Sequence, residues 1–311
     1  MAITIGPGWS IGPGWEISSV PLPSYKAIFG YGSLYGSTKY SMTNLVSNTG
    51  VVGNDVTGVG TARQSLAAAG YGTDKAIFGY GLNVNEEGVS MTNLVSNTGV
   101  VASNTTGVGT TRSRLAAAGY GTDKAIFGYG LSGAGDAISL TNLVSNTGVV
   151  GNDVTGVGTA RHFLAAAGYG TDKAIFGYGS AGPTQSMTNL VSNTGVVGND
   201  VTGVGTARSN LAAAGYGTDK AIFGYGGSPG PTNLVSNTGV VGNDVTRVGT
   251  ARQLLAAACY GTDTAIFGYG TADFSTGLSM TNLVSNTGVV ATDTTGVGTG
   301  RSQLAAAAYS S

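Results

Sequence analysis

The sequence predicts an all-β fold built from six copies of one antiparallel unit. The motif KAIFGYG, or TAIFGYG in the last copy, begins at Lys26, Lys75, Lys124, Lys173, Lys220 and Thr264. The spacing is 49 residues over the first four copies and then 47 and 44, a period typical of propeller blades. The two ends of the sequence carry complementary half-units. These observations predict a six-bladed β-propeller of four-stranded antiparallel blades, closed by pairing of the N- and C-terminal half-blades.

Each unit contains four short strand-forming segments and no helical periodicity. We name them A (LAAAGY), B (KAIFGY), C (TNLVS) and D (from VVGNDV). Gly72-Thr73-Asp74 is a turn signal between A and B, and Asn48-Thr49-Gly50 is a hairpin signal between C and D. Because short strands alternate with turns throughout, every unit reads as one blade.

The ends of the sequence predict how the ring closes. The first unit starts with strand B at Lys26 and lacks strand A, whereas the last residues, Leu304 to Tyr309, form an unaccompanied strand A. Joining these halves completes a sixth blade and removes the sheet edges that an open array exposes. The alternative, a linear β-solenoid, has no use for complementary half-units.

The residues before the first blade form a separate segment. Residues 1–23 contain IGPGW twice, and Pro and Gly preclude a helix, so we expect an extended tail, with residues 24–311 forming the propeller. Trp9 and Trp15 are the expected anchoring residues. They either dock on another subunit or fold back on the propeller rim.

Composition excludes several classes of partner. Charged residues make up 9% of the chain, the formal net charge is −1, and no stretch concentrates Lys or Arg. We therefore expect neither nucleic acid nor membrane as a partner, and neither a membrane span nor an export signal is visible. The single cysteine, Cys259, is interpreted as a small buried residue in place of glycine.

Variation among the copies is expected to gather on one face of the ring. Antiparallel strands place the B–C loops and D–A connections on one face, and the A–B and C–D turns on the other. The B–C loops differ in all six units, as do the two residues after each repeated Arg. We interpret this as a recognition surface; the alternative is tolerated drift in loops.

The expected binding residues combine aromatic side chains, which can stack on sugar rings, with polar ones that can contact hydroxyls. They are Tyr35, Lys39, Tyr40, Asn83, Asn85, Glu86, Glu87, Asp136, Gln185, Asp273, Phe274, His162 and Phe163.

A repeated arginine enters strand A in every unit, and the six should ring the axial opening on the loop side. They are Arg63, Arg112, Arg161, Arg208, Arg252 and Arg301. Such a ring either binds an anion or pairs with the Asp residues of the D segments. The second copy has Asn104 where others have Asp, so Arg112 is the arginine expected to lack a partner.

Catalytic chemistry is not expected. The chain has one His and one Cys, and the residues that would complete a Ser/His/Asp triad with His162 occur by chance in so Ser- and Asp-rich a sequence. The acids Glu86/Glu87, Asp136 and Asp273 lie on three different blades, which does not suit the paired, opposed carboxylates of glycoside hydrolysis. No ligand spacing for a metal and no phosphate loop is present, so neither a metal nor a cofactor is expected.

The segment AR…LAAAGYGTDKAIFGYG resembles the kelch repeat, although a Tyr splits the glycine pair and the kelch Trp is absent. The longer unit TNLVSNTGVV…TTGVGTAR…LAAAGYGTDKAIFGYG is similar to tandem-repeat proteins of tailed bacteriophages of aquatic bacteria, including cyanophages. That resemblance implies a virion protein, such as a fibre, tip or decoration module. Its tail would bind other virion subunits, and its loop face would bind host surface carbohydrate. The alternatives are a purely architectural, self-assembling propeller and a polysaccharide hydrolase.

Overall fold

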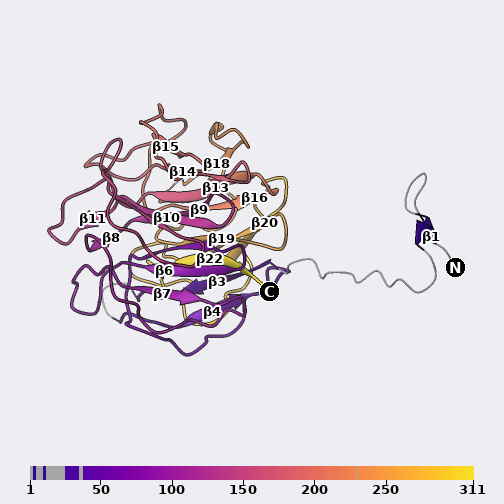
Figure 1. Cartoon of the computed structure of the whole chain (residues 1–311), viewed down its shortest axis with the longest axis horizontal. Helices are drawn as coiled ribbons and strands as arrows, with labels where there is room; N and C mark the ends of the chain where they lie inside the picture. Colours follow the sequence, from indigo (N-terminus) through magenta and orange to yellow (C-terminus); the bar gives the residue numbers. More distant parts are fainter. Residues whose placement is uncertain (1–2, 5–9, 12–24, 35–37, 229) are drawn as a thin grey trace.

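The computed structural model describes residues 3–4, 10–11, 25–34, 38–228 and 230–311. Over these residues the fold is all β: helices are absent, and antiparallel strands form six three-stranded sheets (Figure 1). Each sheet corresponds to one sequence unit. We number the units 1 to 6 in the order of their KAIFGYG motifs.

Each unit has an inner strand A, a middle strand B and a third strand C. The inner strands of units 1 to 6 are β22 (Ala305–Ser310), β5 (Ala67–Tyr71), β9 (Ala116–Tyr120), β13 (Ala165–Tyr169), β16 (Ala212–Tyr216) and β19 (Ala256–Tyr260). The middle strands are β3 (Tyr25–Gly30), β6 (Lys75–Gly79), β10 (Lys124–Gly128), β14 (Lys173–Gly177), β17 (Lys220–Gly224) and β20 (Thr264–Gly268). The third strands are β4 (Thr43–Val46), β7 (Thr92–Val95), β12 (Thr141–Val144), β15 (Thr188–Val191), β18 (Thr232–Val235) and β21 (Thr281–Val284).

The predicted fourth strand is replaced by two isolated bridges per unit. In unit 1 these join Val46 to Val52 and Thr43 to Val56. Between them the side chain of Asn44 donates hydrogen bonds to the Gly53 carbonyl and to Oδ1 of Asp55, over 3.0 and 2.9 Å. A side-chain amide thus occupies acceptors of segment D, which explains why the segment is not a continuous strand.

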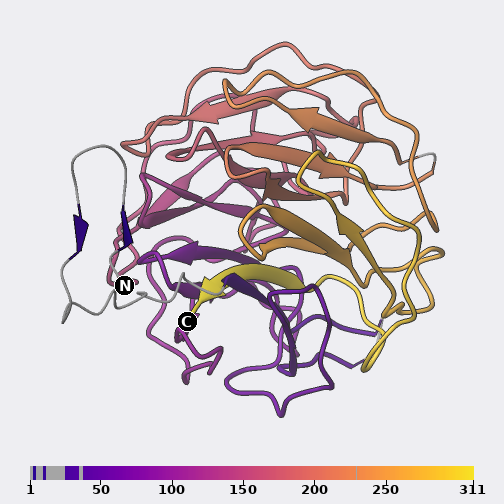
Figure 2. The same ribbon diagram turned by 90° about the vertical axis from the view of Figure 1, so that its right-hand side faces the viewer.

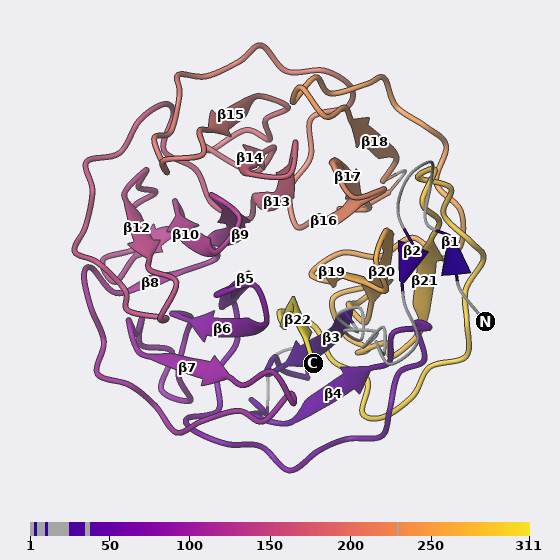
Figure 3. The same cartoon turned by 45° about the vertical axis from the view of Figure 1, so that its right-hand side comes forward.

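The six units are arranged around a common axis, with the inner strands nearest to it and the third strands outside (Figure 3). Each inner strand contacts the inner strands of both neighbouring units, and the series returns from β22 to β5. Unit 1 joins the two ends of the described chain: β22 pairs with β3 from Ala305↔Gly30 to Ser310↔Tyr25. The two half-units therefore pair as the sequence predicted, and Figure 2 shows the yellow and indigo strands side by side.

Aromatic side chains pack the space between neighbouring units. Tyr31 of unit 1 lies 5.2 Å from the ring of Phe78 in unit 2, and the same contact closes the series between Tyr269 and Phe29 at 5.0 Å. The phenylalanines and tyrosines at these positions are fully buried. A Cβ on Gly30 would lie 2.6 Å from the Phe78 ring, so this position requires glycine. The repeated Phe and Tyr residues therefore pack one unit against the next.

Two further strand pairs lie outside the six three-stranded sheets. β8 (Arg112–Ser113) pairs with β11 (Leu131–Ser132) in the connections of unit 3. In the amino-terminal segment β1 (Ile3–Thr4) pairs antiparallel with β2 (Ser10–Ile11). The expected anchors, Trp9 and Trp15, lie outside the described residues.

Candidate functional site

The ring has two unlike faces. We call the one that carries the B–C loops and D–A connections the loop face, and the one that carries the A–B and C–D turns the turn face. Both are closed by backbone hydrogen bonds that pass from unit to unit around the axis.

Six residues, which we call the axial ring, encircle the axis on the loop face. Each amide N–H donates to the carbonyl of the equivalent residue in the neighbouring unit over 2.8–3.0 Å, and the sixth bond closes the circle. The axial ring consists of Ser65, Arg114, Phe163, Asn210, Leu254 and Gln303. All six have φ between 53° and 59°, a left-handed conformation that costs about 1 kcal/mol or more for residues other than glycine. The closed set of hydrogen bonds holds them there.

The axial ring surrounds a cavity of about 100 Å³. Its remaining lining residues are the first leucine of each inner segment: Leu66, Leu115, Leu164, Leu211, Leu255 and Leu304. These leucines are nearly fully buried and do not line the larger cavity of the turn face. The site is therefore a shallow mouth with an apolar floor and six chemically different side chains around it.

Three side chains of units 3 and 4 stack at one side of this mouth. The guanidinium of Arg114 lies 4.6 Å from the centre of the Phe163 ring, and the His162 ring lies 5.1 Å from the same ring. Burial, and secondarily the charge of Arg114, lower the pKa of His162. Its buried Nδ1 has no hydrogen-bond partner among the described residues, so no carboxylate orients it as a triad would require.

Elsewhere around the mouth, polar groups differ in how they are satisfied. The Ser65 hydroxyl donates to the Gln303 side chain. The Oδ1 of Asn210 is buried and has no partner within the described part of the chain. The sequence placed all six axial-ring residues in the variable pairs after the repeated arginines, but among them only Phe163 was named as a binding residue. Their left-handed backbone was not predicted, because a left-handed residue that is not glycine leaves no signal in the sequence.

The charged residues predicted in the B–C loops of units 1 and 2 contact one another. Lys39 forms an ion pair with Glu86, and Gln64 donates to the other Glu86 oxygen over 3.4 Å. Asn83 organises its own loop: its Oδ1 accepts the backbone N–H groups of residues 85 and 87, and its Nδ2 donates to Glu87. These side chains therefore brace the loops as well as lie on the loop face.

The other predicted loop residues are not brought into one cluster. Asp273 accepts the backbone N–H groups of residues 275 and 276 at 2.9 Å, and these bonds hold its pKa well below the usual range. Gln185 donates to the carbonyl of residue 183 in its own loop. Phe274 is 40% exposed. Asn85 and Asp136 are exposed and Tyr40 is partly exposed, while Tyr35 lies outside the described residues.

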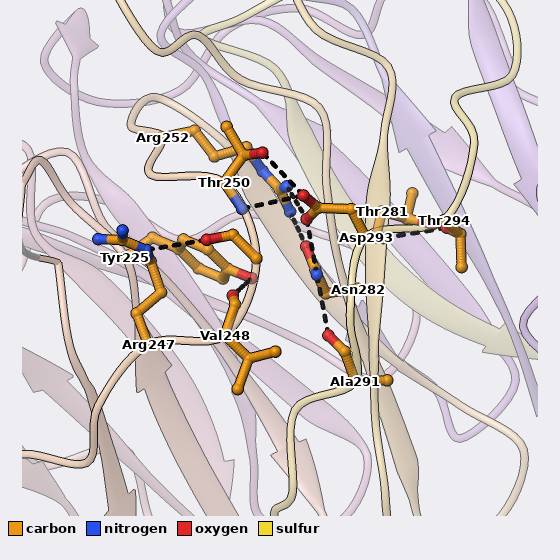
Figure 4. A network of polar contacts seen from close by, with 11 residues as sticks. Tyr225, Arg247, Val248, Thr250, Arg252, Thr281, Asn282, Ala291, Asp293 and Thr294 are labelled. Atoms are coloured by element: carbon orange, nitrogen blue, oxygen red, sulfur yellow. Dashed lines mark hydrogen bonds and ion pairs between the residues drawn. The ribbon is translucent and has the colours of Figure 1, made fainter.

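Of the two alternatives for the repeated arginines, the contacts favour pairing within the protein over an anion-binding ring at the axial opening. All six repeated arginines are buried, with at most 4% exposure, and each guanidinium lies over the Tyr of the preceding unit at 4.1–4.8 Å. Figure 4 shows the contacts in units 5 and 6, where Arg252 reaches Asn282 and Asp293. In unit 4, Arg161 donates from Nε to the Tyr178 carbonyl at 2.9 Å. The donors therefore bond within the arginine's own unit while the guanidinium packs on the Tyr of the preceding unit, so these groups are not presented to a ligand.

The Asp that faces a repeated arginine belongs to the arginine's own unit and not, as expected, to the D segment that precedes the arginine in the sequence. Asp55 lies 4.0 Å from Arg301, whose strand opens the same unit, and Asp200 lies 3.8 Å from Arg161 in the same way. Asn104 consequently stands opposite the segment of Arg63, where it accepts the Thr61 N–H. The arginine without a facing carboxylate is thus Arg63 and not Arg112.

These aspartates also fasten the connection between units. Asp200 accepts the backbone N–H and the hydroxyl of Thr159, and the side chain of Asn189, over 2.7–3.2 Å. Partial burial raises the pKa of the Asp200 carboxyl, but these hydrogen bonds outweigh it and hold the pKa below its usual value. These hydrogen bonds therefore have a structural role in the ring and do not form a ligand site.

The turn face holds a larger cavity around the axis, of about 580 Å³. Its walls are mostly alanine, glycine and tyrosine of the inner strands, and Lys75, Lys124, Lys173 and Lys220 line it near the turns. Each of these lysines pairs with the preceding Asp at 2.7–3.0 Å. A site of this size was not expected on the face whose sequence is most uniform.

Cys259 lines this cavity and is exposed, which corrects its interpretation as a buried residue. The thiol opens to the cavity yet is surrounded by protein, and this burial raises its pKa. Among the described residues, no charged group lowers the pKa of this thiol and so activates it as a nucleophile.

The described residues contain neither a metal-binding cluster nor a membrane-spanning helix. No group of three or more His, Cys, Asp or Glu residues in this part of the chain could hold a metal ion. Nor does it contain a helix long and apolar enough to cross a membrane.

No protein-family model matches the sequence, and no curated protein is significantly similar to it.

Proposed function

We propose that the chain is a closed six-bladed β-propeller that serves as a non-enzymatic recognition module, with the loop face as its binding surface. The observation that carries this proposal is the axial ring: one backbone arrangement is repeated six times and presents six different side chains. A fixed frame with variable side chains is the arrangement by which rigid scaffolds present binding residues.

The propeller assignment is supported by the cyclic interactions of the six units. Backbone hydrogen bonds encircle the axis on both faces; on the turn face they run, for example, from the Gly72 N–H to the Asp123 carbonyl at 2.7 Å. The pairing of β22 with β3 supplies the last sheet of the series. Closure of this kind gives unit 1 the same three strands as the other units, and radial repetition leaves only short, protected edges.

A glycan is the ligand that the loop face fits best. The face offers few charges, aromatic side chains such as Phe163 and Phe274, and amides such as Asn210, a combination suited to stacking on sugar rings and bonding to hydroxyls. The resemblance to tandem-repeat virion proteins makes host surface carbohydrate the proposed source. In this proposal the amino-terminal segment binds other subunits of a phage particle.

The test compares the full chain with a loop-graft variant. In the graft, the B–C loops of units 1, 2, 3, 4 and 6 are replaced by the short loop of unit 5, residues 227–231. Both proteins are titrated against acidic and neutral oligosaccharides, with the turn-face variant Lys124→Ala as control. We expect the graft alone to lose binding. Unchanged binding by the graft, or no binding by the wild-type chain, would remove the proposal.

One observation favours the alternative of an architectural protein. A valine of the C–D turn is 65–66% exposed in every unit, giving six equivalent apolar residues around the ring: Val51, Val100, Val149, Val196, Val240 and Val289. Such a set suits self-association. Sedimentation of the wild-type chain and of a Val100→Lys/Val196→Lys/Val289→Lys variant at high concentration tests it, with Val84→Lys as the control, since Val84 is 62% exposed in a B–C loop.

A further inference from the structure

We propose that the mouth enclosed by the axial ring binds the acidic group of a sugar, with Arg114 contacting the carboxylate, Phe163 the apolar face of the sugar ring and Asn210 a hydroxyl. This inference rests on the proposed recognition function of the loop face and names the part of the ligand that this face distinguishes. The sequence already indicated Phe163 as a sugar-binding residue, whereas Arg114 and Asn210 were indicated only as members of the variable pairs.

The backbone of the axial ring leaves recognition to side chains. Its N–H groups and carbonyls bond to each other around the circle, so they are not available to a ligand. The leucine floor offers no polar group. A ligand that enters the mouth therefore meets only the six side chains of the ring.

Charge selects the class of ligand. Among the residues that line the mouth, Arg114 carries the only charge, and no acidic residue lines it. A cation beside an apolar floor attracts an anion more strongly than it would in open water, because the surroundings are less polarisable. The guanidinium is also positioned over the Phe163 ring at 4.6 Å, which limits its freedom before a ligand arrives. A carboxylate accepts two parallel hydrogen bonds from such a group.

The remaining groups indicate a sugar rather than a simple anion. The buried Oδ1 of Asn210 is an acceptor without a protein donor in the described residues, and a sugar hydroxyl can supply one. The Phe163 ring is partly exposed and offers a stacking face next to the guanidinium. An inorganic anion would use Arg114 alone and leave both other groups without a role.

The size of the mouth sets how much of the ligand enters. A cavity of about 100 Å³ equals the liquid volume of roughly three water molecules, which suits a carboxylate and not a whole sugar. The rest of the sugar must lie above the axial ring, where the B–C loops surround the mouth. The acidic group thus binds at the axis, and the B–C loops contact the remainder of the glycan.

The repeat supplies variants that the fold already accepts. Gln303 and Leu254 occupy the same left-handed position as Arg114 and Phe163, so Arg114→Gln and Phe163→Leu place residues that this backbone holds in other units. We expect both to keep the thermal unfolding temperature of the wild-type chain. Arg247→Gln is the matched control, because Arg247 lies outside the mouth, where its Nε donates to the Gly249 carbonyl.

The experiment titrates the full chain and these variants with D-glucuronate, D-glucose and inorganic sulfate by ligand-observed NMR. We expect saturable binding of glucuronate by wild type and Arg247→Gln, weakened about ten-fold or more in Arg114→Gln and less in Phe163→Leu. Glucose and sulfate should both bind more weakly than glucuronate. Equal affinity for glucuronate and glucose, binding of sulfate as tight as that of glucuronate, or an unchanged Arg114→Gln variant would overturn the inference.

The oligosaccharide titrations separate this inference from the proposed function. If the loop graft abolishes oligosaccharide binding while Arg114→Gln leaves the preference for acidic oligosaccharides intact, the recognition function stands and the axial assignment is wrong. If glucuronate binds through Arg114 but no oligosaccharide binds the wild-type chain, the axial site stands and the glycan function of the loop face is wrong.

Discussion

Both faces of the ring are closed by backbone hydrogen bonds between units, but the turns of one face are nearly uniform in sequence whereas the loops of the other vary. On the turn face, the Tyr71 ring fills the space where a Cβ on Gly148 would lie, 2.9 Å from Cζ, so the next unit must supply glycine. On the loop face, the axial-ring side chains line an open mouth, and Ser, Arg, Phe, Asn, Leu and Gln all fit. Glycine is therefore required where a side chain would meet a neighbouring unit, whereas different side chains fit at the axial ring because they face open space.

The largest effect should come from breaking the framework that both faces share. Arg161→Leu removes the donors to the Tyr178 carbonyl and to Asn189 from a fully buried site. We expect a loss of about 3–5 kcal/mol in the free energy of unfolding, measured by urea denaturation. Arg247→Leu, on the outer edge, is the control and should change it by under about 0.5 kcal/mol. Similar losses for both would show that the buried arginines do not hold the units together.

A matched pair of glycines tests the contrast between the faces directly. Gly195 (φ 84°) on the turn face and Gly135 (φ 90°) in a B–C loop have similar backbones, but a Cβ meets Tyr120 at 2.9 Å in the first and nothing within 4 Å in the second. Alanine at Gly135 should cost only the left-handed strain, about 1–2 kcal/mol. Alanine at Gly195 should cost about 1–3 kcal/mol more, because of overpacking. Equal losses would contradict the explanation given for the uniform turns.

The turn-face cavity can be probed through its own cysteine. Because Cys259 is exposed inside the cavity and burial raises the pKa of its thiol, iodoacetamide should modify it in the folded chain, but more slowly than in the urea-unfolded chain at pH 8. The rate in the folded chain should keep rising at pH values where an ordinary thiol has levelled off. Mass spectrometry follows the reaction. A complete lack of modification would mean that the cavity is closed to small molecules.

The smallest effect concerns the aspartates between the units. The pKa of Asp200 is lowered in the folded chain, so its contribution to stability is present above the unfolded pKa and is lost as pH falls through the folded value. Asp200→Asn should therefore unfold at a slightly lower temperature than wild type at pH 7, and the difference should shrink below about pH 4. Asn104 holds the equivalent place in unit 2 and shows that the amide fits. A difference that is constant with pH would exclude this electrostatic role.

The sequence was sufficient for features that depend on short-range pattern and repetition. The A, B and C strands follow from the LAAAGY, KAIFGY and TNLVS segments, and the pairing of the two half-units follows from their complementarity. Segment D was predicted as a strand, because its VVGNDV pattern does not reveal that Asn44 will bond to its carbonyl.

The site was less predictable, because it depends on contacts between units. A repeated Arg before an inner strand is compatible with an anion-binding ring or with pairing to Asp until the structure places the Tyr of the preceding unit beneath each guanidinium. The partner of Asp55 lies at the far end of the sequence, at Thr299, so the pairing of Asp and Arg was assigned to the wrong copies. The left-handed axial ring involves no glycine, and only the closed circle of hydrogen bonds explains it.

The joint between β22 and β3 has a consequence for how the chain reaches its native state. During synthesis β3 emerges before the other strands of the six units, and its inner partner β22 emerges after them, so unit 1 stays incomplete while the other five can form. Because Tyr25 and Ser310 lie side by side, a short linker could join them and new termini could be opened in another turn. Such a circular permutant, with whole units at both ends, would have to close the ring by packing alone, and its folding rate would measure what the shared sheet contributes.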